Sequence, residues 1–308
     1  MLLPIEEVGL METIGFIGLG IMGKPMCKNL MKAGYGAIVC DVIQAAVDEM
    51  VAEGAKAAKT PAEVARQVDR IITMLPDSPQ VKQVVMGPNG ILEGARKGSI
   101  IIDMSSIAPS AAKEVHDAAK AKGVRMLDAP VSGGQPGAIN ATLSIMVGGD
   151  KADFEENYEL MKVMGKSVVL VGSIGAGNTV KLCNQIIVML NIAALGEALV
   201  LGTKAGVDPE AIFDAIKGGL AGSNVMNAKT PMVLDRNFKP GFRIDLHIKD
   251  IANALQTGKE IGAPLPLTGL VAQIMQAMKV QGHGSDDHSA IVQFFEQLAG
   301  CEVKRLPH

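Results

Sequence analysis

The chain has 308 residues, more than most single domains contain, which predicts two domains. Hydrophobic residues make up 48% and charged residues 20%, which excludes a disordered chain and leaves enough apolar side chains for large cores. A formal net charge of −3, without any basic cluster, argues against nucleic acid as a partner.

The first eleven residues, MLLPIEEVGLM, lack the basic start and the long apolar stretch of a signal peptide. We expect residues 1–11 to be an N-terminal extension, since Met11 directly precedes the first predicted strand. The longest apolar run, 186–202, is interrupted by Asn191 and Glu197 and is too short to span a membrane.

Four scattered cysteines without a CxxC pair indicate reduced thiols. We therefore expect a cytoplasmic protein without a membrane partner.

A glycine-rich turn follows the first predicted strand, residues 14–17, and precedes a predicted helix over 25–34. Gly18, Gly20 and Gly23 have the G-x-G-x-x-G spacing of a dinucleotide-binding turn. The first glycine allows the tight turn, the second lets a pyrophosphate approach, and the third lets helix and strand pack closely. The free N–H groups of the helix N-terminus favour phosphate. The predicted cofactor contacts are Gly18, Leu19, Gly20, Ile21, Met22 and Gly23; a turn without ligand is the alternative.

Asp41 closes the second predicted strand, 18 residues beyond Gly23. A carboxylate at this place accepts hydrogen bonds from the ribose hydroxyls of the adenosine. It repels a 2′-phosphate, and neither Val42 nor Ile43 offers the arginine that would accommodate one. NAD, as NADH, is therefore favoured over NADP. The alternative is an aspartate that only caps the next turn.

Apolar strand-like stretches alternate with helix-like stretches up to about residue 171. A helix over 60–67 is predicted to start with a capping box of Thr60 and Glu63. Further strands are predicted over 70–76, 99–105, 124–131, 143–149 and 167–172. Near-continuous apolar strands between amphipathic helices predict a parallel sheet covered on both faces. We expect a Rossmann-type, doubly wound α/β domain over residues 12–173.

The pattern changes to helices alone after Gly172, which predicts an all-α C-terminal domain over residues 174–308. Helices are predicted over 178–204, 209–219, 244–261, 267–280 and 289–300. The first is apolar on almost every face and must be buried on every side. We expect this long helix to lie between domains or subunits, and the protein to be a homodimer or homotetramer.

Ser132, Gly133 and Gly134 follow the strand over 124–131. A hydroxyl beside unobstructed backbone N–H groups forms a small anion cradle, suited to a substrate carboxylate. An ordinary glycine turn is an equal alternative.

Lys181 lies near the start of the long helix, and Asn184 and Gln185 share its face at helical spacing. A lysine on an apolar helix is costly to bury, so we expect it to point into a polar cleft. Burial would lower the pKa of its ammonium, which allows proton exchange with a substrate oxygen. A lysine that extends along the helix surface to solvent is an equal alternative.

Asp245 is predicted to be the N-cap of the helix over 244–261, with Lys249 one turn further on the same face. Lys249 could close over a cofactor, although its spacing favours a surface pair with Asp245. His116 and His247 have no partners at metal-ligand or triad spacing, so no metal site is predicted.

Four stretches in this order, GFIGLGIMG, DAPVSGG, GAGNTVKLCNQ and IKD, resemble the motifs of the β-hydroxyacid dehydrogenase family. The resemblance covers nearly the whole chain from Met11. It implies hydride transfer between a nicotinamide cofactor and a small carboxylated aldehyde or β-hydroxyacid. A non-catalytic NAD-binding protein of the same fold is the alternative. The presence of Lys181 together with Ser132, Gly133 and Gly134 argues against it.

The resemblance also implies roles for individual residues. Lys181 would be the catalytic general acid in reduction, and Ser132, Gly133 and Gly134 would bind the substrate carboxylate. Asn184 and Gln185 would orient the substrate, where many relatives have asparagine at both places. Besides the glycine turn and Asp41, the implied cofactor contacts are Met74, Leu75, Ser106, Phe242 and Lys249. Relatives often carry Asp-Arg after the second strand, and the missing arginine strengthens the preference for NADH.

Overall fold

The computed structural model describes residues 11–306, so the predicted extension lies outside the described residues except for the backbone of Met11. The chain divides into two compact units that meet between Lys181 and Leu182. Unit 1 holds the sheet and unit 2 is helical. The long helix α9 (Ala176–Lys204) begins in unit 1 and continues into unit 2.

Unit 1 is built on a nine-stranded sheet of the order β3-β2-β1-β4-β5-β6-β8-β7, with β9 paired to β8, within the described residues. The strands are β1 (Met11–Ile17), β2 (Tyr35–Cys40), β3 (Lys56–Ala57), β4 (Arg70–Thr73), β5 (Ile100–Asp103), β6 (Arg125–Asp128), β7 (Val131–Ser132), β8 (Leu143–Gly148) and β9 (Gly165–Gly172). The first six in this order are parallel and give the doubly wound Rossmann topology.

The sheet becomes mixed at β8, which runs antiparallel to both β6 and β7. Parallel neighbours need a crossover of a dozen or more residues, and the stretch between Ser132 and Leu143 is shorter than that. β9 then returns parallel to β8 after the helix α8 (Lys151–Lys162). The sequence pattern predicted β8 and β9, and one strand over 124–131 where the structure has β6 and β7, but it did not predict the change of direction.

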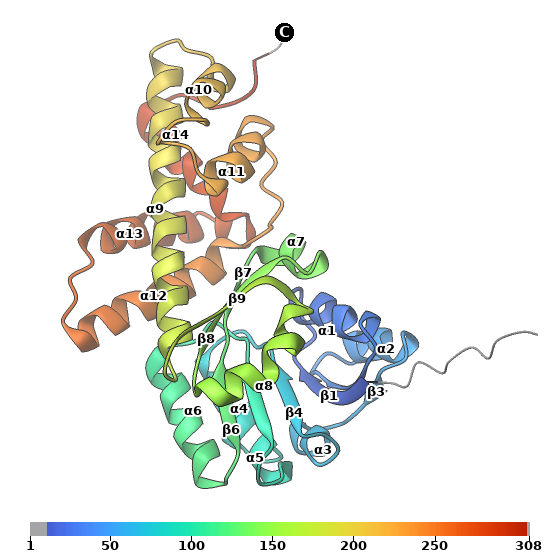
Figure 1. Cartoon of the computed structure of the whole chain (residues 1–308). Coiled ribbons are helices and arrows are strands. Elements are labelled where there is room, and N and C mark those ends of the chain that lie inside the picture. Colours follow the sequence, from blue (N-terminus) through green and yellow to red (C-terminus); the bar gives the residue numbers. More distant parts are fainter. Residues whose placement is uncertain (1–10, 307–308) are drawn as a thin grey trace, which may run out of the picture. The chain divides into compact units, whose positions relative to one another are not determined.

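Helices cover both faces of this sheet (Figure 1). One core contains side chains from α1 (Gly23–Lys32), α2 (Gln44–Ala52), α7 (Gly134–Ile139) and α8. The opposite core contains side chains from α3 (Pro61–Ala65), α4 (Ser78–Met86), α5 (Ile91–Gly94) and α6 (Pro109–Ala121). Along β5, Ile100 and Ile102 belong to the first core and Ile101 to the second. Burial on both faces explains why these strands are apolar throughout.

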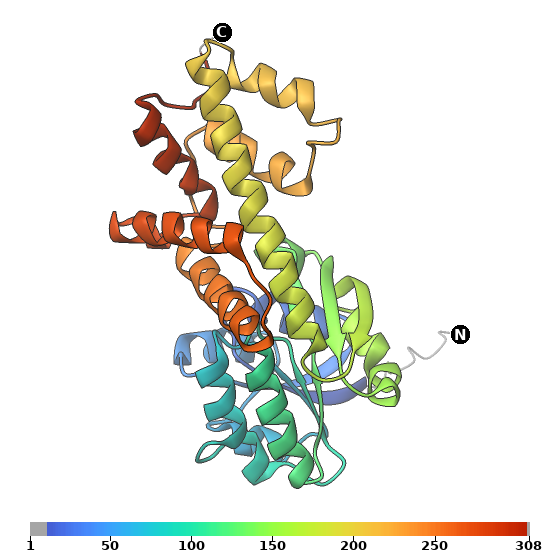
Figure 2. The ribbon, with the colours of Figure 1, turned by 90° about the vertical axis from the view of Figure 1, so that its left-hand side faces the viewer.

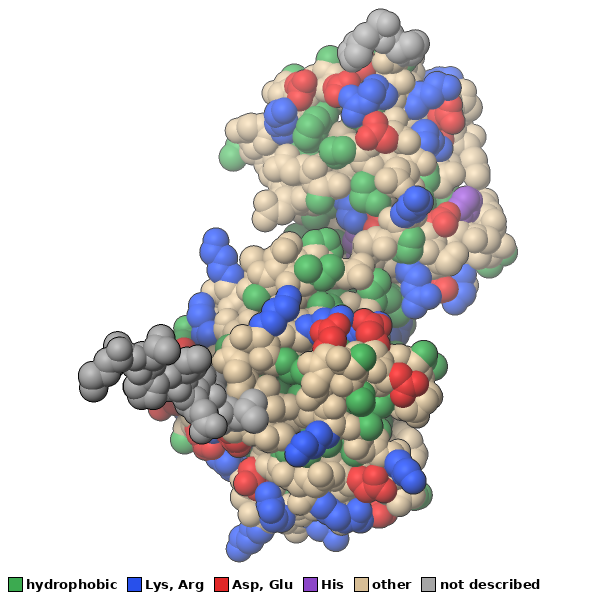
Figure 3. All heavy atoms as spheres, turned by 90° about the vertical axis from the view of Figure 1, so that its right-hand side faces the viewer, with side chains coloured by type: hydrophobic (Ala, Val, Ile, Leu, Met, Phe, Trp, Pro, Cys, Tyr) green, Lys and Arg blue, Asp and Glu red, His purple; other side chains and the backbone are tan. Residues whose placement is uncertain are grey.

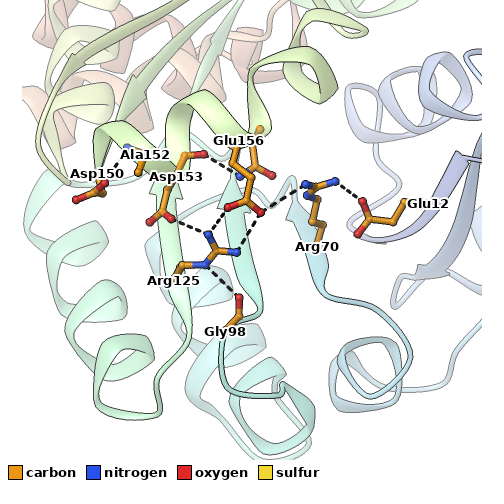
Figure 4. Close-up of polar contacts among 9 residues, drawn as sticks. Glu12, Arg70, Gly98, Arg125, Asp150, Ala152, Asp153 and Glu156 are labelled. Carbon is orange, nitrogen blue, oxygen red and sulfur yellow. Dashed lines mark hydrogen bonds and ion pairs between the residues drawn. The ribbon is translucent and has the colours of Figure 1, made fainter.

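An ion-pair network fastens α8 to the amino-terminal ends of β4 and β6, the edge opposite the glycine turn (Figure 4). The Arg125 guanidinium binds Asp153 at 2.8 Å and Glu156 at 2.5 Å. Arg70 contacts the same Glu156 at 3.5 Å and also pairs with Glu12. The hydrogen bonds that Arg125 donates to Glu156 raise the pKa of Arg125 and lower the pKa of Glu156. Both groups therefore stay charged.

One predicted helix cap is confirmed in its first half, and another is wrong. The Thr60 hydroxyl accepts from the Glu63 N–H at 3.1 Å, but the Glu63 carboxylate accepts from the N–H of Lys59. The helix α12 (Ile244–Ile261) has Arg243 rather than Asp245 at its N-cap position. Backbone pairing of Arg243 with Asp287 fixes that earlier start, so the N-cap prediction was wrong.

Unit 2 contains only helices among its described elements (Figure 2). They are the main part of α9, then α10 (Pro209–Ile216), α11 (Asn224–Leu234), α12, α13 (Pro266–Val280) and α14 (Val292–Ala299), with short 3₁₀ turns at 283–285 and 288–291. Their core joins Met189 and Leu199 of α9 to Ile251 of α12 and Met275 of α13. The helix α11 has no counterpart among the predicted helices, because Pro231 interrupts its pattern.

The helix α9 has the length and hydropathy of a membrane-crossing helix, yet it supplies core residues to unit 2. In its most apolar stretch, 39% of the residues are buried within this chain. Ile187 and Leu201 remain 60% and 73% exposed. One face of α9 is therefore a core face, while the other is left uncovered by this single chain.

Candidate cofactor edge and catalytic helix

The parallel strands β1, β2, β4, β5 and β6 all end at one edge of the sheet. The residues that directly follow their ends therefore gather there, and ligands of doubly wound sheets bind at this edge. In unit 1 the structure brings to this edge Gly18, Asp41, Met74, Leu75, Ser106 and, as the last residue of β7, Ser132.

The three glycines of the turn differ in what surrounds them. Gly18 has φ +97°, and a Cβ there would lie 2.2 Å from the carbonyl oxygen of Met74. A Cβ on Gly23 would lie 1.9 Å from the carbonyl oxygen of Gly18. At Gly20 nothing lies within 4 Å of such a Cβ. The first and third glycines are thus required by the fold, whereas the second leaves an open face that fits an approaching pyrophosphate.

The other residues of the turn point in different directions. Leu19 is only 2% exposed and belongs to the core beneath the turn, and Met22 packs against the same core. Ile21 is 52% exposed. Leu19 and Met22 therefore offer mainly their backbone to a ligand, while Ile21 also offers its side chain.

Asp41 joins the end of β2 to the glycine turn. Its Oδ2 accepts a hydrogen bond from the N–H of Leu19 at 2.5 Å, and its Oδ1 accepts from Ile43 at 2.8 Å. The carboxylate thus caps the following turn, as the alternative reading had it. Each carboxylate oxygen keeps a second acceptor position, so the side chain can also accept from a ribose hydroxyl.

A surface hollow of about 610 Å³ borders Gly20 and Asp41. Lys24 and Lys28 on α1 line it and bind Glu49 of α2 at 2.6 and 3.0 Å. The charges of these two lysines are therefore already paired with an acidic side chain. Figure 3 shows acidic and basic side chains interspersed over this side of the molecule.

Met74 and Leu75 follow β4 and are half-buried. The N–H of Met74 donates to the carbonyl oxygen of Ile17 at 2.9 Å, and the N–H of Leu75 donates to the hydroxyl of Ser105 at 2.9 Å. Sequence reasoning selected Ser106, which is half-buried, but not Ser105, which is fully buried and shapes this loop.

The Ser132–Gly134 segment turns from β7 into α7. Gly133 has φ +138° and Gly134 has φ +60°, and L side chains rarely adopt either conformation. The backbone alone therefore requires both glycines. Ser132 is half-buried at the strand end.

The helix α9 carries Lys181, Asn184 and Gln185 within little more than one turn. Lys181 is 7% exposed and Gln185 is 4% exposed, so the lysine does not extend into solvent. The amide of Asn184 donates to the Gln185 side chain at 2.9 Å. Gln185 in turn donates through Nε2 to Oδ2 of Asp250 at 2.5 Å.

Asp250 is a residue that sequence reasoning missed, although it ends the IKD motif. It is 2% exposed and also binds the ammonium of Lys249 at 2.9 Å. The proposed surface pair of Lys249 with Asp245 is therefore wrong, since Asp245 binds Lys279 at 2.9 Å. Within unit 2, Asp250 links Lys249 to Gln185.

Phe242 lies against two buried histidines, with ring centroids 5.6 Å from His247 and 5.5 Å from His288. The Nδ1 atoms of these histidines are 3.0 Å apart, so one ring donates and the other accepts. His247 also contacts the carbonyl oxygen of Gln185 through Nε2 at 3.2 Å. His247, for which no role was predicted, is thus a buried side chain that contacts the backbone of Gln185.

Asp287 anchors the loop that holds Phe242. Its carboxylate binds Lys229 at 2.9 Å and accepts from the N–H groups of Gly241 and Phe242 at 3.0 and 3.1 Å. Burial raises the pKa of Asp287, but the charges of His288 and Lys229, with the hydrogen bonds from Lys229 and from the N–H of Ser289, outweigh it, so the pKa lies below its ordinary value. The carboxylate therefore stays ionised at neutral pH.

Two family models together match most of the chain. The NAD binding domain of 6-phosphogluconate dehydrogenase matches residues 13–172, and the NAD-binding domain of NADP-dependent 3-hydroxyisobutyrate dehydrogenase matches 175–295. The chain is 44% identical over 290 residues to 2-hydroxy-3-oxopropionate reductase of Escherichia coli, covering 94% of this chain and 99% of that one. The chain belongs to the β-hydroxyacid dehydrogenase family.

Other members of the family are similar over the same length. The 2-(hydroxymethyl)glutarate dehydrogenase of Eubacterium barkeri is 42% identical, covering 94% of this chain and 97% of that one. The structure of 3-hydroxyisobutyrate dehydrogenase from Mycobacterium tuberculosis superposes with a TM-score of 0.86 at 34% identity, covering 92% and 99% of the two chains. This β-hydroxyacid dehydrogenase is thus an NAD(P)-dependent oxidoreductase with a Rossmann domain followed by a helical domain.

Proposed function

We propose that the protein reduces 2-hydroxy-3-oxopropionate (tartronate semialdehyde) to D-glycerate with NADH. The similarity to the E. coli reductase over 94% of the chain is the observation that carries the choice of substrate. The stretches DMSSIAP, GGLAGS, DRNFKPGFRIDLHIKD and KLCNQ also resemble those of tartronate semialdehyde reductases. This substrate carries a carboxylate, which the Ser132–Gly134 turn would bind, and an aldehyde, whose oxygen the buried lysine would protonate.

The proposed chemistry assigns one task to each group of residues. The backbone N–H groups of Gly133 and Gly134, with the Ser132 hydroxyl, bind the substrate carboxylate. When bound, the reduced nicotinamide supplies the hydride. Negative charge builds on the aldehyde oxygen as its double bond opens, and Lys181 donates the proton that completes the alcohol. Asn184 and Gln185 orient the substrate for this transfer.

The proposed cofactor contacts are the glycine turn, Asp41, Met74, Leu75, Ser106, Phe242 and Lys249. The preference for NADH is supported by Asp41, whose carboxylate repels a 2′-phosphate. Val42 and Ile43, which follow it, are 96% and 60% exposed and carry no charge. Lys24 and Lys28 on α1 border the same hollow, and both are already paired with Glu49.

A second candidate reaction is the oxidation of 2-(hydroxymethyl)glutarate, which the 42% identity to the E. barkeri enzyme supports. One or two pocket contacts can decide between such substrates, because a single contact changes the free energy of the transition state by about 1–3 kcal/mol. Related β-hydroxyacids and semialdehydes, namely 3-hydroxyisobutyrate, glyoxylate, succinic semialdehyde and sulfolactaldehyde, belong to the same test.

The test is a set of initial rates for these substrates, each with NAD(H) and NADP(H), followed by nicotinamide absorbance. We expect the highest kcat/KM for 2-hydroxy-3-oxopropionate with NADH. A higher kcat/KM for any other substrate would replace the proposed substrate, and a preference for NADPH would refute the role of Asp41. NADH binding without turnover of any substrate would favour a non-catalytic NAD-binding protein.

We also propose that the protein is a cytoplasmic homodimer or homotetramer. The exposed apolar side chains of α9, Ile187 and Leu201, support a partner subunit on that face. All four cysteines are free thiols, which suits a reducing compartment. Light scattering on the purified protein should give twice or four times the chain mass of 32.1 kDa, and a monomer would refute the assembly.

A further inference from the structure

A buried carboxylate holds the start of the helix that carries Lys181. Asp128 is the last residue of β6, and its side chain is fully buried. Its Oδ1 accepts a hydrogen bond from the backbone N–H of Gly175 at 2.7 Å. Its Oδ2 accepts from the backbone N–H of Asn178 at 2.8 Å and from the Asn178 side-chain amide at 3.3 Å. All three donors lie in the first turn of α9 or just before it.

The backbone at the start of α9 is in close contact with the ends of β6 and β8 around these hydrogen bonds. A Cβ on Gly177 would lie 2.5 Å from the carbonyl oxygen of Asp128 and 2.4 Å from that of Met146. A Cβ on Gly148 would lie 2.3 Å from Oδ1 of Asp128. Glycine is therefore required at the end of β8 and in the first turn of α9, because the helix start packs directly against the ends of β6 and β8.

Asn178 connects this point to the loop that follows β5. Its side-chain oxygen accepts a hydrogen bond from the N–H of Ile107 at 2.9 Å, one residue beyond Ser106. Lys181 follows Asn178 by three residues, so both lie on one face of α9, one turn apart. The hydrogen bonds that Asp128 accepts thereby fix the position and rotation of the turn from which Lys181 projects.

We propose that Asp128 is a positioning residue, whose ionised carboxylate clamps the first turn of α9 and thereby places Lys181 for proton transfer. The proposal rests on the proposed role of Lys181 as proton donor. An ionised carboxylate has only acceptors and so suits three N–H donors, whereas a protonated carboxyl or an amide turns a donor toward one of them. Loss of the clamp displaces Lys181, and a displacement of about 1 Å can cost ~10²-fold in rate.

The surroundings of Asp128 make its charge sensitive to pH. Asp103 is its neighbour on β5 and is fully buried, the side chain of Lys113 on α6 lies against Gly175, and Lys181 lies one turn further along α9. Burial raises the pKa of Asp128 to about 7, helped by the charge of Asp103 and opposed by the N–H groups of Asn178 and Gly175. The clamp should therefore weaken as the pH falls through about 7.

The test compares the variants Asp128→Asn and Asp103→Asn in the full-length enzyme. For Asp128→Asn we expect kcat of reduction to fall by ~10–10²-fold, with an unchanged Kd for NADH. The decline of wild-type kcat below about pH 7 should disappear in that variant. Asp103→Asn keeps the clamp but removes the neighbouring charge, so the same decline should move to lower pH. A purely structural role of Asp128 would lower the melting temperature without changing the pH profile.

The outcomes separate the clamp from the function on which it rests. An Asp128→Asn enzyme with the wild-type kcat and pH profile would overturn the clamp. If that variant does not fold, Asp103→Asn decides, and an unmoved decline overturns the proposal. If Lys181→Ala keeps the wild-type rate, the role of Lys181 fails instead, whatever Asp128→Asn shows.

Discussion

The three glycine positions Gly18, Gly20 and Gly98 allow the requirements of the fold to be separated from those of the cofactor. Gly98 has φ +92°, and nothing lies within 4 Å of an added Cβ. Gly98→Ala therefore measures only the free-energy cost of holding an L residue in this backbone conformation, about 1–2 kcal/mol. Gly18→Ala has the same backbone cost and places its methyl 2.2 Å from the carbonyl oxygen of Met74. Its loss of unfolding free energy should therefore exceed that of Gly98→Ala. Urea denaturation of the two variants measures both values.

Gly20→Ala should behave in the opposite way. Its φ is not in the positive range and its Cβ has open space, so the unfolding free energy should change by less than ~0.5 kcal/mol. The methyl occupies the face where the pyrophosphate must approach the backbone, so the Kd for NADH measured by fluorescence titration should rise at least ~10-fold. Gly98→Ala, remote from the turn, is the control and should bind NADH as the wild type does. An unchanged Kd in Gly20→Ala would refute the assignment of that open face to the cofactor.

Three further predictions concern charges and buried polar groups. Asp287→Ala leaves Lys229 without its buried partner and should destabilise by about 3–5 kcal/mol in urea denaturation. Because the pKa of Asp287 is lowered, this difference should be complete above about pH 4 and shrink as the pH falls below it; a difference independent of pH would contradict the ionised carboxylate. Arg125→Met removes partly exposed pairs, so it should cost no more than about 1 kcal/mol per pair and less in 1 M salt, and a larger loss would contradict this reading. Asp250→Ala leaves the buried amide of Gln185 without an acceptor and should cost about 1–3 kcal/mol in the same assay; an unchanged stability would show that water replaces the carboxylate.

The local signals of the first domain were sufficient to predict its architecture. The alternation of apolar strands with amphipathic helices reflects burial on both faces, as Ile100, Ile101 and Ile102 show. The glycine motif could be located from the sequence because only glycine fits at Gly18 and Gly23, where a Cβ would collide with a backbone carbonyl oxygen. The direction of β8 could not be predicted in this way, since strand direction depends on the length of the connection and on strand pairing rather than on the pattern of side chains.

The site residues that sequence reasoning missed are those whose role depends on distant partners. Asp250 was part of a recognised motif, but its contact with Gln185 joins positions 65 residues apart. Asp128 also began a recognised motif, yet its link to Asn178 spans 50 residues. His247 was given no role because its partner His288 lies on another element. The error at Asp245 has the same origin, since a strand-like bridge to Asp287 decides where α12 begins.

The most direct test of the proposed function is the turnover of Lys181→Ala with NADH and 2-hydroxy-3-oxopropionate, measured together with the Kd for NADH. The loss of the proton donor should lower kcat by ~10²–10⁴-fold, while NADH binding at the glycine turn stays the same. A Lys181→Ala enzyme that keeps the wild-type kcat would contradict the assignment of proton transfer to this buried lysine.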